Sequence, residues 1–241
     1  MLSKFGVDVE YNKPNIRLRI VLSVLFLIFV YHKFIYFDNT TLKNVDMEPF
    51  SEPQQEMIEN GKSFEHKVKD GTAIITPIAS YKIYGRVYDR HYRPYKLALA
   101  SMYPYDVSIG FGDFKHREVY NSINVKMAGT TAYASYSGRA WNNHLSKYFK
   151  TDSLEHCFTN NHLCPANSKV RRGISRLRKK DVVYIEGYLI KFQLVRKNGN
   201  YEKGISSTTR NNNEGTWGNN GNGSCEQIYV TRIVTRHGDY K

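Results

Sequence analysis

The segment His156–Asn167 contains the densest set of side chains that could bind a metal or take part in covalent chemistry. Its sequence, HCFTNNHLCPAN, holds two histidines, two cysteines and several amides in twelve residues, and we expect it to form a loop. As a metal site, Cys157, His162 and Cys164 would supply ligands together with His156, but their spacing matches no standard zinc pattern. We therefore predict no resident metal and no cofactor, with a divalent metal as the alternative.

The two cysteines of this segment offer a disulfide as a second interpretation. Cys157 and Cys164 would close a short loop, and an exported chain would permit the bond. The third interpretation is ordinary loop packing with free thiols. Cys225 makes the number of cysteines odd and could replace either partner, so the sequence leaves the pairing open.

The motif HLCPAN also resembles the segment around the catalytic histidine of non-specific ββα-metal nucleases, in which Asp-Arg-Gly-His is followed by Leu-x-Pro-Ala. The tetrad position here reads Thr159-Asn160-Asn161-His162, so only the histidine matches. The resemblance implies that His162 is a general base that activates water, with a downstream asparagine holding Mg²⁺. Asn167 is too near to be that asparagine. A metal-dependent phosphodiesterase or nuclease that uses His162 is our alternative function.

Seven cations crowd into the twelve residues that begin at Lys169, on a stretch whose apolar residues recur with helical spacing. Val170, Ile174 and Leu177 fall at i, i+4 and i+7, with Ser168 as an N-cap, which predicts one amphipathic helix. Its cations should then face solvent as a ridge that binds polyanions. The alternative is a solvated face without a specific ligand. The seven cations are Lys169, Arg171, Arg172, Arg176, Arg178, Lys179 and Lys180.

The sequence lacks the short motifs that mark many enzymes: it has no Gly-x-Ser-x-Gly, P-loop, HExxH or EF-hand loop. Asp106, Asp113 and Glu226 lie beside apolar strands and could form a carboxylate pair. An acid at a turn or strand edge more often accepts hydrogen bonds from the backbone. We therefore favour a binding or structural module over an enzyme and leave catalysis open.

Short apolar segments rich in β-branched and aromatic residues indicate a domain built mainly from strands. The strongest strand predictions are Tyr81–Tyr88, Val182–Phe192 and Cys225–Val234. The stretch Gly138–Asn167 is polar without clear periodicity, and residues 196–224 read as a long Asn- and Gly-rich loop. With one or two helices, the pattern predicts an α+β, mainly β fold, either a small OB-like or SH3-like barrel or a curved sheet.

An apolar segment near the N-terminus is long enough to cross a bilayer. Residues 20–37 would cover roughly 27 Å as a helix, and no small residues follow that would suit a cleavage site. Four basic residues precede the segment, against Lys33 near its C-terminal end and Lys43 after it, which favours an N-in orientation in the cytoplasmic (inner) membrane. We predict a cytoplasmic tail at 1–19, a single-pass signal anchor at 20–37, a polar stalk at 38–72 and an exported, periplasmic domain at 73–241.

The positive charge belongs to the exported part of the chain. Thirty-five Lys and Arg against 22 Asp and Glu give a formal net charge of +13; residues 39–241 hold 30 of the bases and 19 of the acids, a net +11. Such an excess predicts an anionic partner. We expect a protein partner, an anionic polymer or lipid head groups, since cytoplasmic nucleic acid would lie across the membrane. The predicted function is a membrane-anchored, extracytoplasmic module that binds this partner through its basic face.

An ordered series of motifs runs through the predicted domain. The motifs are GRVY at Gly85–Tyr88, YPYDVSIGFGDF at Tyr103–Phe114, TNNHLCPA at Thr159–Ala166, KKDVVYIEGYLI at Lys179–Ile190, a Gly-rich loop with Trp217, and SCEQIYV at Ser224–Val230. The series resembles a family of uncharacterised bacterial proteins that have one N-terminal membrane span and a soluble domain. The resemblance covers about residues 78–234 and implies this architecture but no activity. The chain departs from it at Phe111, where we expect Trp, and by the additional Cys157 and Cys164.

Overall fold

Strands are the commonest element of the fold, which the computed structural model describes together with several short helices. It describes residues 16–31, 42–94, 99–128, 131–149, 157–206 and 225–241. The fold is α+β and mainly β, as the sequence predicts.

The N-terminal helix α1 covers Ile16–Tyr31, and its side chains from Leu18 to Phe29 are exposed. It comprises 16 residues, and the rest of the segment 20–37 that we expected to cross a membrane lies outside the described residues. Among the residues that the structure describes, no helix is long and apolar enough to span a bilayer.

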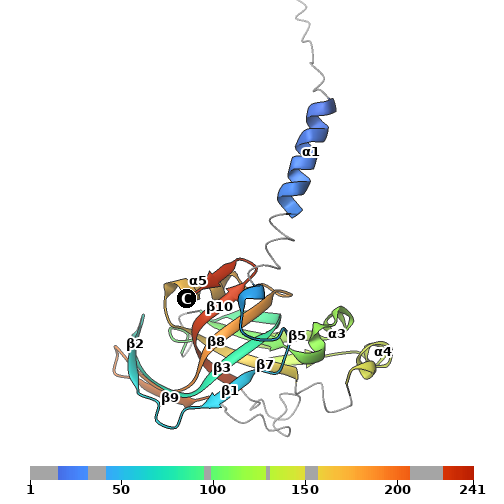
Figure 1. Ribbon diagram of the computed structural model, residues 1–241. Helices are drawn as coiled ribbons and strands as arrows, with labels where there is room; N and C mark the ends of the chain where they lie inside the picture. The colour runs from blue at the N-terminus through green and yellow to red at the C-terminus, as the bar shows by residue number, and fades with distance from the viewer. Residues whose placement is uncertain (1–15, 32–41, 95–98, 129–130, 150–156, 207–224) are drawn as a thin grey trace, which may run out of the picture.

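Five strands pair edge to edge in a closed ring (Figure 1). Around the ring the order is β3, β4, β7, β10 and β8, and pairing between β3 and β8 closes it. The pair β7–β10 is parallel and the other four pairs are antiparallel. The bounds are β3 Gly71–Tyr92, β4 Tyr105–Gly110, β7 Phe158–Pro165, β8 Val182–Arg196 and β10 Cys225–Thr235.

The inner face of this ring holds the largest hydrophobic cluster, to which every one of the five strands contributes a fully buried residue. These residues are Ile83, Val107, Leu163, Ile185 and Ile228. Side chains alternate between the two faces of a strand, so the residues between them point outward. The helix α5 (Ser168–Arg176) packs its apolar residues into the same cluster and contacts β10.

In the described part of the chain, four shorter strands pair with three strands of the ring. The strands β1 (Gln54–Met57) and β2 (Phe64–Val68) pair with β3, β9 (Tyr201–Ile205) pairs with β8, and β11 (Gly238–Tyr240) pairs with β10. Residues 54–68, which we expected in a polar stalk, are therefore part of the sheet. The sequences of β1 and β2 are mostly polar and show no alternation of apolar residues. Both strands lie at the edge of the sheet, where their side chains are partly exposed.

A second layer of small elements covers one side of the ring, where rings of Tyr88, Phe114, Tyr120 and Phe158 pack together. It contains the two-stranded sheet β5–β6. The elements are η3 Gly112–Lys115, α3 Arg117–Ser122, β5 Asn124–Ala128, β6 Thr131–Ser135, α4 Gly138–Asn143 and η4 Leu145–Lys147. The short η2 (Leu42–Asn44) lies elsewhere, where Leu42 packs against a cluster that contains Tyr84 and Tyr184.

The strands predicted at Tyr81–Tyr88, Val182–Phe192 and Cys225–Val234 are confirmed, and so is the amphipathic helix. Its predicted N-cap is wrong, because Asn167 and not Ser168 accepts the hydrogen bonds of the first backbone amides. The expected loop at His156–Asn167 is wrong, because Phe158–Pro165 is the strand β7 and all eight of its residues are buried. A strand paired on both edges and covered on both faces need not alternate apolar and polar residues.

Candidate functional site

A buried histidine and a buried aspartate face each other on neighbouring strands of the ring. Asp106 in β4 lies directly opposite His162 in β7, and both point to the outer face because their neighbours Val107 and Leu163 point into the core. The distance from His162 Nδ1 to Asp106 Oδ1 is 2.6 Å. Asp106 has no exposed surface and His162 is 8% exposed. The carboxylate fixes the orientation of the ring and assigns the proton to Nδ1.

Arg93, which follows β3, completes this network. Its Nε donates to Asp106 Oδ2 at 2.5 Å, and its Nη2 lies 3.0 Å from His162 Nδ1. Only 4% of Arg93 is exposed. Two cations that share one buried carboxylate satisfy both of its oxygens, which is the condition under which buried charges are tolerated.

A thiol and an amide continue the polar outer face from β7 to β10. Cys225 in β10 lies opposite Asn160 in β7, and Asn160 Nδ2 is 3.4 Å from Cys225 Sγ. Cys225 also lies close enough to the His162 ring to raise its pKa. Burial on its own would lower the pKa of His162, but the hydrogen bond to Asp106 and the proximity of Cys225 raise that pKa to about 9.

The metal and disulfide interpretations of this segment do not fit the strand. Within the described residues there is no group of three or more His, Cys, Asp or Glu placed to hold a metal ion, and His156 lies outside those residues. Cys157 and Cys164 stand at opposite ends of β7, roughly 20 Å apart at the rise of an extended strand. A disulfide needs Cα atoms within about 7 Å. The Cys157–Cys164 disulfide that the sequence left open is therefore not formed.

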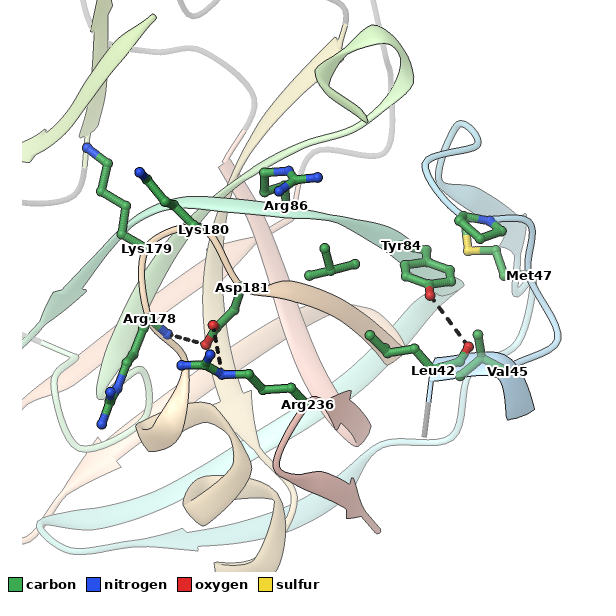
Figure 2. A pocket seen from close by; sticks show the side chains of 12 residues that line it. Leu42, Val45, Met47, Tyr84, Arg86, Arg178, Lys179, Lys180, Asp181 and Arg236 are labelled. Atoms are coloured by element: carbon green, nitrogen blue, oxygen red, sulfur yellow. Dashed lines mark hydrogen bonds and ion pairs between the residues drawn. The ribbon is translucent and has the colours of Figure 1, made fainter. Parts of the chain in front are cut away.

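A second site is a hollow of about 850 Å³ that is rich in cations. It lies where the turn between α5 and β8 meets the segment that begins with η2. Figure 2 shows Lys179 and Lys180 on one side of it and Leu42, Met47 and Tyr84 on the other. Five basic side chains and one acid line the hollow, a net charge of +4, and we call it the basic groove. These charged residues are Arg86, Arg178, Lys179, Lys180, Arg236 and Asp181.

The turn at Arg178–Asp181 holds its lysines in a fixed conformation. Asp181 Oδ2 accepts a hydrogen bond from the Arg178 backbone amide, and Asp181 Oδ1 pairs with Arg236 Nε at 3.2 Å. Lys180 has a φ of 80°, a left-handed conformation that is costly for a residue with a Cβ. Its amide donates to the carbonyl of Val87. The single acid of the groove is thus occupied inside the turn.

Aromatic rings lie beside the cations of the basic groove. The Arg86 guanidinium lies 5.5 Å from the ring centroid of Phe50 and 5.6 Å from that of Tyr120, and Lys180 Nζ lies 5.9 Å from the Tyr120 ring. A second hollow of about 540 Å³ begins beyond Tyr120 and shares Lys179 and Lys180 with the first. The cations therefore form a positive strip between two hollows.

The seven predicted cations divide into two groups. The helix α5 ends at Arg176, so Arg178, Lys179 and Lys180 do not extend its face but turn into the basic groove. On the helix, Lys169 and Arg172 are exposed, Arg171 is half-buried, and Arg176 donates to the Tyr240 hydroxyl at 2.9 Å. The prediction that the seven cations form one continuous ridge is wrong. The helix ends at Arg176, and from Leu177 the chain turns toward β8.

Several site residues had no signal that the sequence could reveal on its own. Arg86 and Arg236 reach the basic groove from β3 and from the end of β10, far from the cation-rich segment. Arg93 and Cys225 were not assigned to a site with His162. Asp106 was noted as an acid beside a strand and expected to bond the backbone at a turn; instead it holds Arg93 and His162.

Comparison with known proteins finds no matching family model, no similar curated protein and no similar solved structure. The two sites are therefore interpreted from their own geometry.

Proposed function

We propose that the protein is a membrane-anchored, extracytoplasmic binding module whose basic groove takes a phosphate-bearing polyanion, such as lipid head groups or an anionic polymer. The observation that carries the proposal is the groove's uncompensated charge. Five cations share one carboxylate, and that carboxylate is engaged by Arg236 and by the turn. An anionic ligand would supply the counter-charge.

The cations nearest the hollow are available for such a ligand. Within the part of the chain that the structure describes, no carboxylate lies within ion-pair distance of Arg178, Lys179 or Lys180, and all three are exposed. Arg86 is half-buried, and its Nε has no hydrogen-bond partner among the described residues. A phosphate group offers several acceptor oxygens, which a guanidinium and neighbouring ammonium groups can share.

The strand order supports a barrel of the OB type, the finer form of the fold that we expected. In that fold a five-stranded barrel binds oligonucleotides and oligosaccharides through its surface and loops. Here the ring β3-β4-β7-β10-β8 contains one parallel pair and carries α5 between its third and fourth strands in chain order. Ligands of that kind are extended chains, consistent with a groove that continues into a second hollow.

The N-terminal segment supports the anchor. The exposed apolar side chains of α1 would be covered by a bilayer, and the apolar sequence continues to Phe37. The basic groove includes Leu42, eleven residues after Tyr31, a distance of at most roughly 37 Å for an extended chain. With the N-terminus in the cytoplasm, the groove would stay close to the outer surface of the cytoplasmic membrane.

Binding of fluorescent inorganic polyphosphate to the purified full-length protein tests the proposal. We expect the triple variant Arg178→Gln, Lys179→Gln, Lys180→Gln to lose about 10- to 100-fold in affinity and to show a weaker dependence on salt. The matched control neutralises Lys115, Lys126 and Lys147, which are exposed outside the groove, and should change affinity by less than about threefold. Equal losses in the two triple variants would mean that net charge, and not the groove, holds the polyanion. Failure of the wild-type protein to bind would leave a protein partner as the better proposal.

A metal-dependent phosphodiesterase remains the second candidate, favoured by one observation. Asp106 holds the His162 ring as the partner of a general base does. Degradation of nucleic acid with Mg²⁺ that stops with EDTA and in His162→Ala would support this function. Activity that persists in His162→Ala would exclude His162 as its base.

A further inference from the structure

Three adjacent strands bring an acid, an imidazole and a thiol together on the outer face of the ring. Asp106 in β4 is opposite His162 in β7, and Cys225 in β10 is opposite Asn160, two residues before His162. Residues two apart on one strand share a face, so all four side chains lie on one side of the sheet. This site is separate from the basic groove, and an inference about it is independent of polyanion binding.

The hydrogen bonds assign a role to each nitrogen of the His162 ring. Nδ1 is 2.6 Å from Asp106 Oδ1 and 3.0 Å from Arg93 Nη2, so it faces β4. These contacts occupy Nδ1 and leave Nε2 as the ring nitrogen that could exchange a proton with Cys225, whose side chain lies on the same face of the sheet. This is the order in which a nucleophile, a base and an orienting acid are arranged in covalent catalysis.

The surroundings of Cys225 suit a nucleophile better than do those of the other two thiols. Cys225 is partly exposed at the first residue of β10, whereas Cys164 is fully buried and burial raises its pKa far above the ordinary value. Asn160 Nδ2 points at Cys225 Sγ from 3.4 Å. An amide donor beside the nucleophile can also reach an oxygen that develops negative charge on the atom under attack.

We propose that Cys225 is the nucleophile of an acyl-transfer site, with His162 as its general acid and base, Asn160 as a donor to the oxyanion, and Asp106 and Arg93 as positioning residues. Substrates of this chemical class are activated esters or thioesters. The site differs from the phosphodiesterase candidate in requiring the thiol and no metal.

The reaction divides into two balanced steps. In the neutral form of the ring, which the pKa of about 9 makes the major form only at alkaline pH, His162 Nε2 accepts the thiol proton and Cys225 Sγ bonds to the acyl carbon. The bond from that carbon to the leaving oxygen then breaks as His162 returns the proton to the leaving alcohol. Water then gives a proton to His162 and attacks the thioester carbon. The C–S bond breaks, the thiol regains its proton and the free acid is released, so that ester and water yield acid and alcohol.

Alkylation by iodoacetamide, located by peptide mass spectrometry, tests the paired thiol in the full-length protein. At pH 6.5 we expect Cys225 to be labelled at least about ten times faster in the wild type than in His162→Gln, because a neighbouring imidazole activates a thiol. Wild-type labelling of Cys225 that is no faster than that of Cys157 would overturn the proposal without reference to any variant. Cys157 serves as the internal control thiol.

Reaction with p-nitrophenyl acetate tests acyl transfer. We expect a burst of p-nitrophenolate with the acetyl group on Cys225, and loss of at least about 90% of the burst in Cys225→Ser and in His162→Gln. Cys157→Ser should keep the full burst. An unchanged burst in Cys225→Ser, or acetyl groups only on lysines, would refute the assignment. Circular dichroism of each variant establishes that a lost burst is not lost folding.

Discussion

The two sites of this protein use charge in opposite ways. Arg93, Asp106 and His162 are buried, and each has a charged partner within 3.0 Å. In the basic groove, Lys179 and Lys180 are exposed, and among the described residues no carboxylate pairs with either. A buried charge must be paired to be tolerated, whereas an exposed one is stabilised by water.

This difference in burial and pairing of charge suits the two sites to different functions. In the buried network, hydrogen bonds hold the His162 ring in one position and one orientation. Such a ring suits a reaction in which one defined atom must take part. The basic groove holds like charges close together with few internal partners, which suits a ligand that brings its own negative charge. The contrast predicts large effects of substitution on stability in the network and small ones in the groove.

Removing the carboxylate of the network should have the largest effect. Asp106→Asn leaves Arg93 buried without a counter-charge, and we expect the free energy of unfolding to fall by about 3–5 kcal/mol. The measurement is the midpoint of urea unfolding at constant m-value. Asp239→Asn is the matched control, because Asp239 also pairs with an arginine, Arg232 at 2.8 Å, but near the surface; it should cost about 1 kcal/mol or less. Equal costs would remove the distinction between the two environments.

The pH dependence of stability should come next in size. The pKa of His162 is about 9 in the folded state, above its ordinary value of 6.5, so the folded protein binds this proton more tightly. The resulting stability is fully present below pH 6.5 and is lost as the pH rises through 9, by up to about 3 kcal/mol. Burial lowers the pKa of His66 and His237, so those residues titrate below this window.

Urea unfolding measured from pH 6 to pH 9.5 checks this expectation. His162→Gln is the informative variant, because it should flatten the profile while leaving any contribution from surface groups. A wild-type profile that is flat, or a slope that survives in His162→Gln, would show that the network does not hold the proton of His162.

The sequence revealed the basic groove more readily than the buried network. Exposure and burial of the charged residues explain this difference. A run of cations such as Arg178, Lys179 and Lys180 is visible because exposed charge can be contiguous in sequence. The network draws Arg93, Asp106, His162 and Cys225 from four separate segments, and only the register of β4, β7 and β10 brings the last three together. His162 was singled out by its neighbours in sequence, but its partners could not be.

The sequence predicted the fold where apolar residues recur with the spacing of a helix or a strand. It did not predict the fold where they show no such spacing. The strand Val182–Phe192 and the helix of Val170 and Ile174 show such periods, and both form. The strand β7 contains Thr159, Asn160 and Asn161, which read as a loop. They are tolerated in a buried strand because their side chains find partners, as Asn161 Nδ2 does with the Val107 carbonyl and Thr159 Oγ1.

The smallest expected effect distinguishes backbone strain from charge within the basic groove. Lys180 has a left-handed φ of 80°, and Lys179 does not. Lys180→Gly relieves this conformation, although glycine also makes the unfolded chain more flexible, so stability should stay level or rise by up to about 1 kcal/mol. Lys179→Gly removes the same charge without relieving strain and should cost about 0.5–1 kcal/mol.

Both glycine variants should weaken polyphosphate binding by a similar factor, about 3- to 10-fold, because each removes one exposed cation of the groove. Urea unfolding and polyphosphate titration of the two variants therefore separate stability from affinity at neighbouring positions. If Lys180→Gly destabilises the protein as much as Lys179→Gly, the left-handed turn carries no cost. If it instead gains stability while losing affinity, the turn holds Lys180 in a conformation that serves the ligand at the expense of the fold, which is the behaviour expected of a binding site and not of a solvated surface.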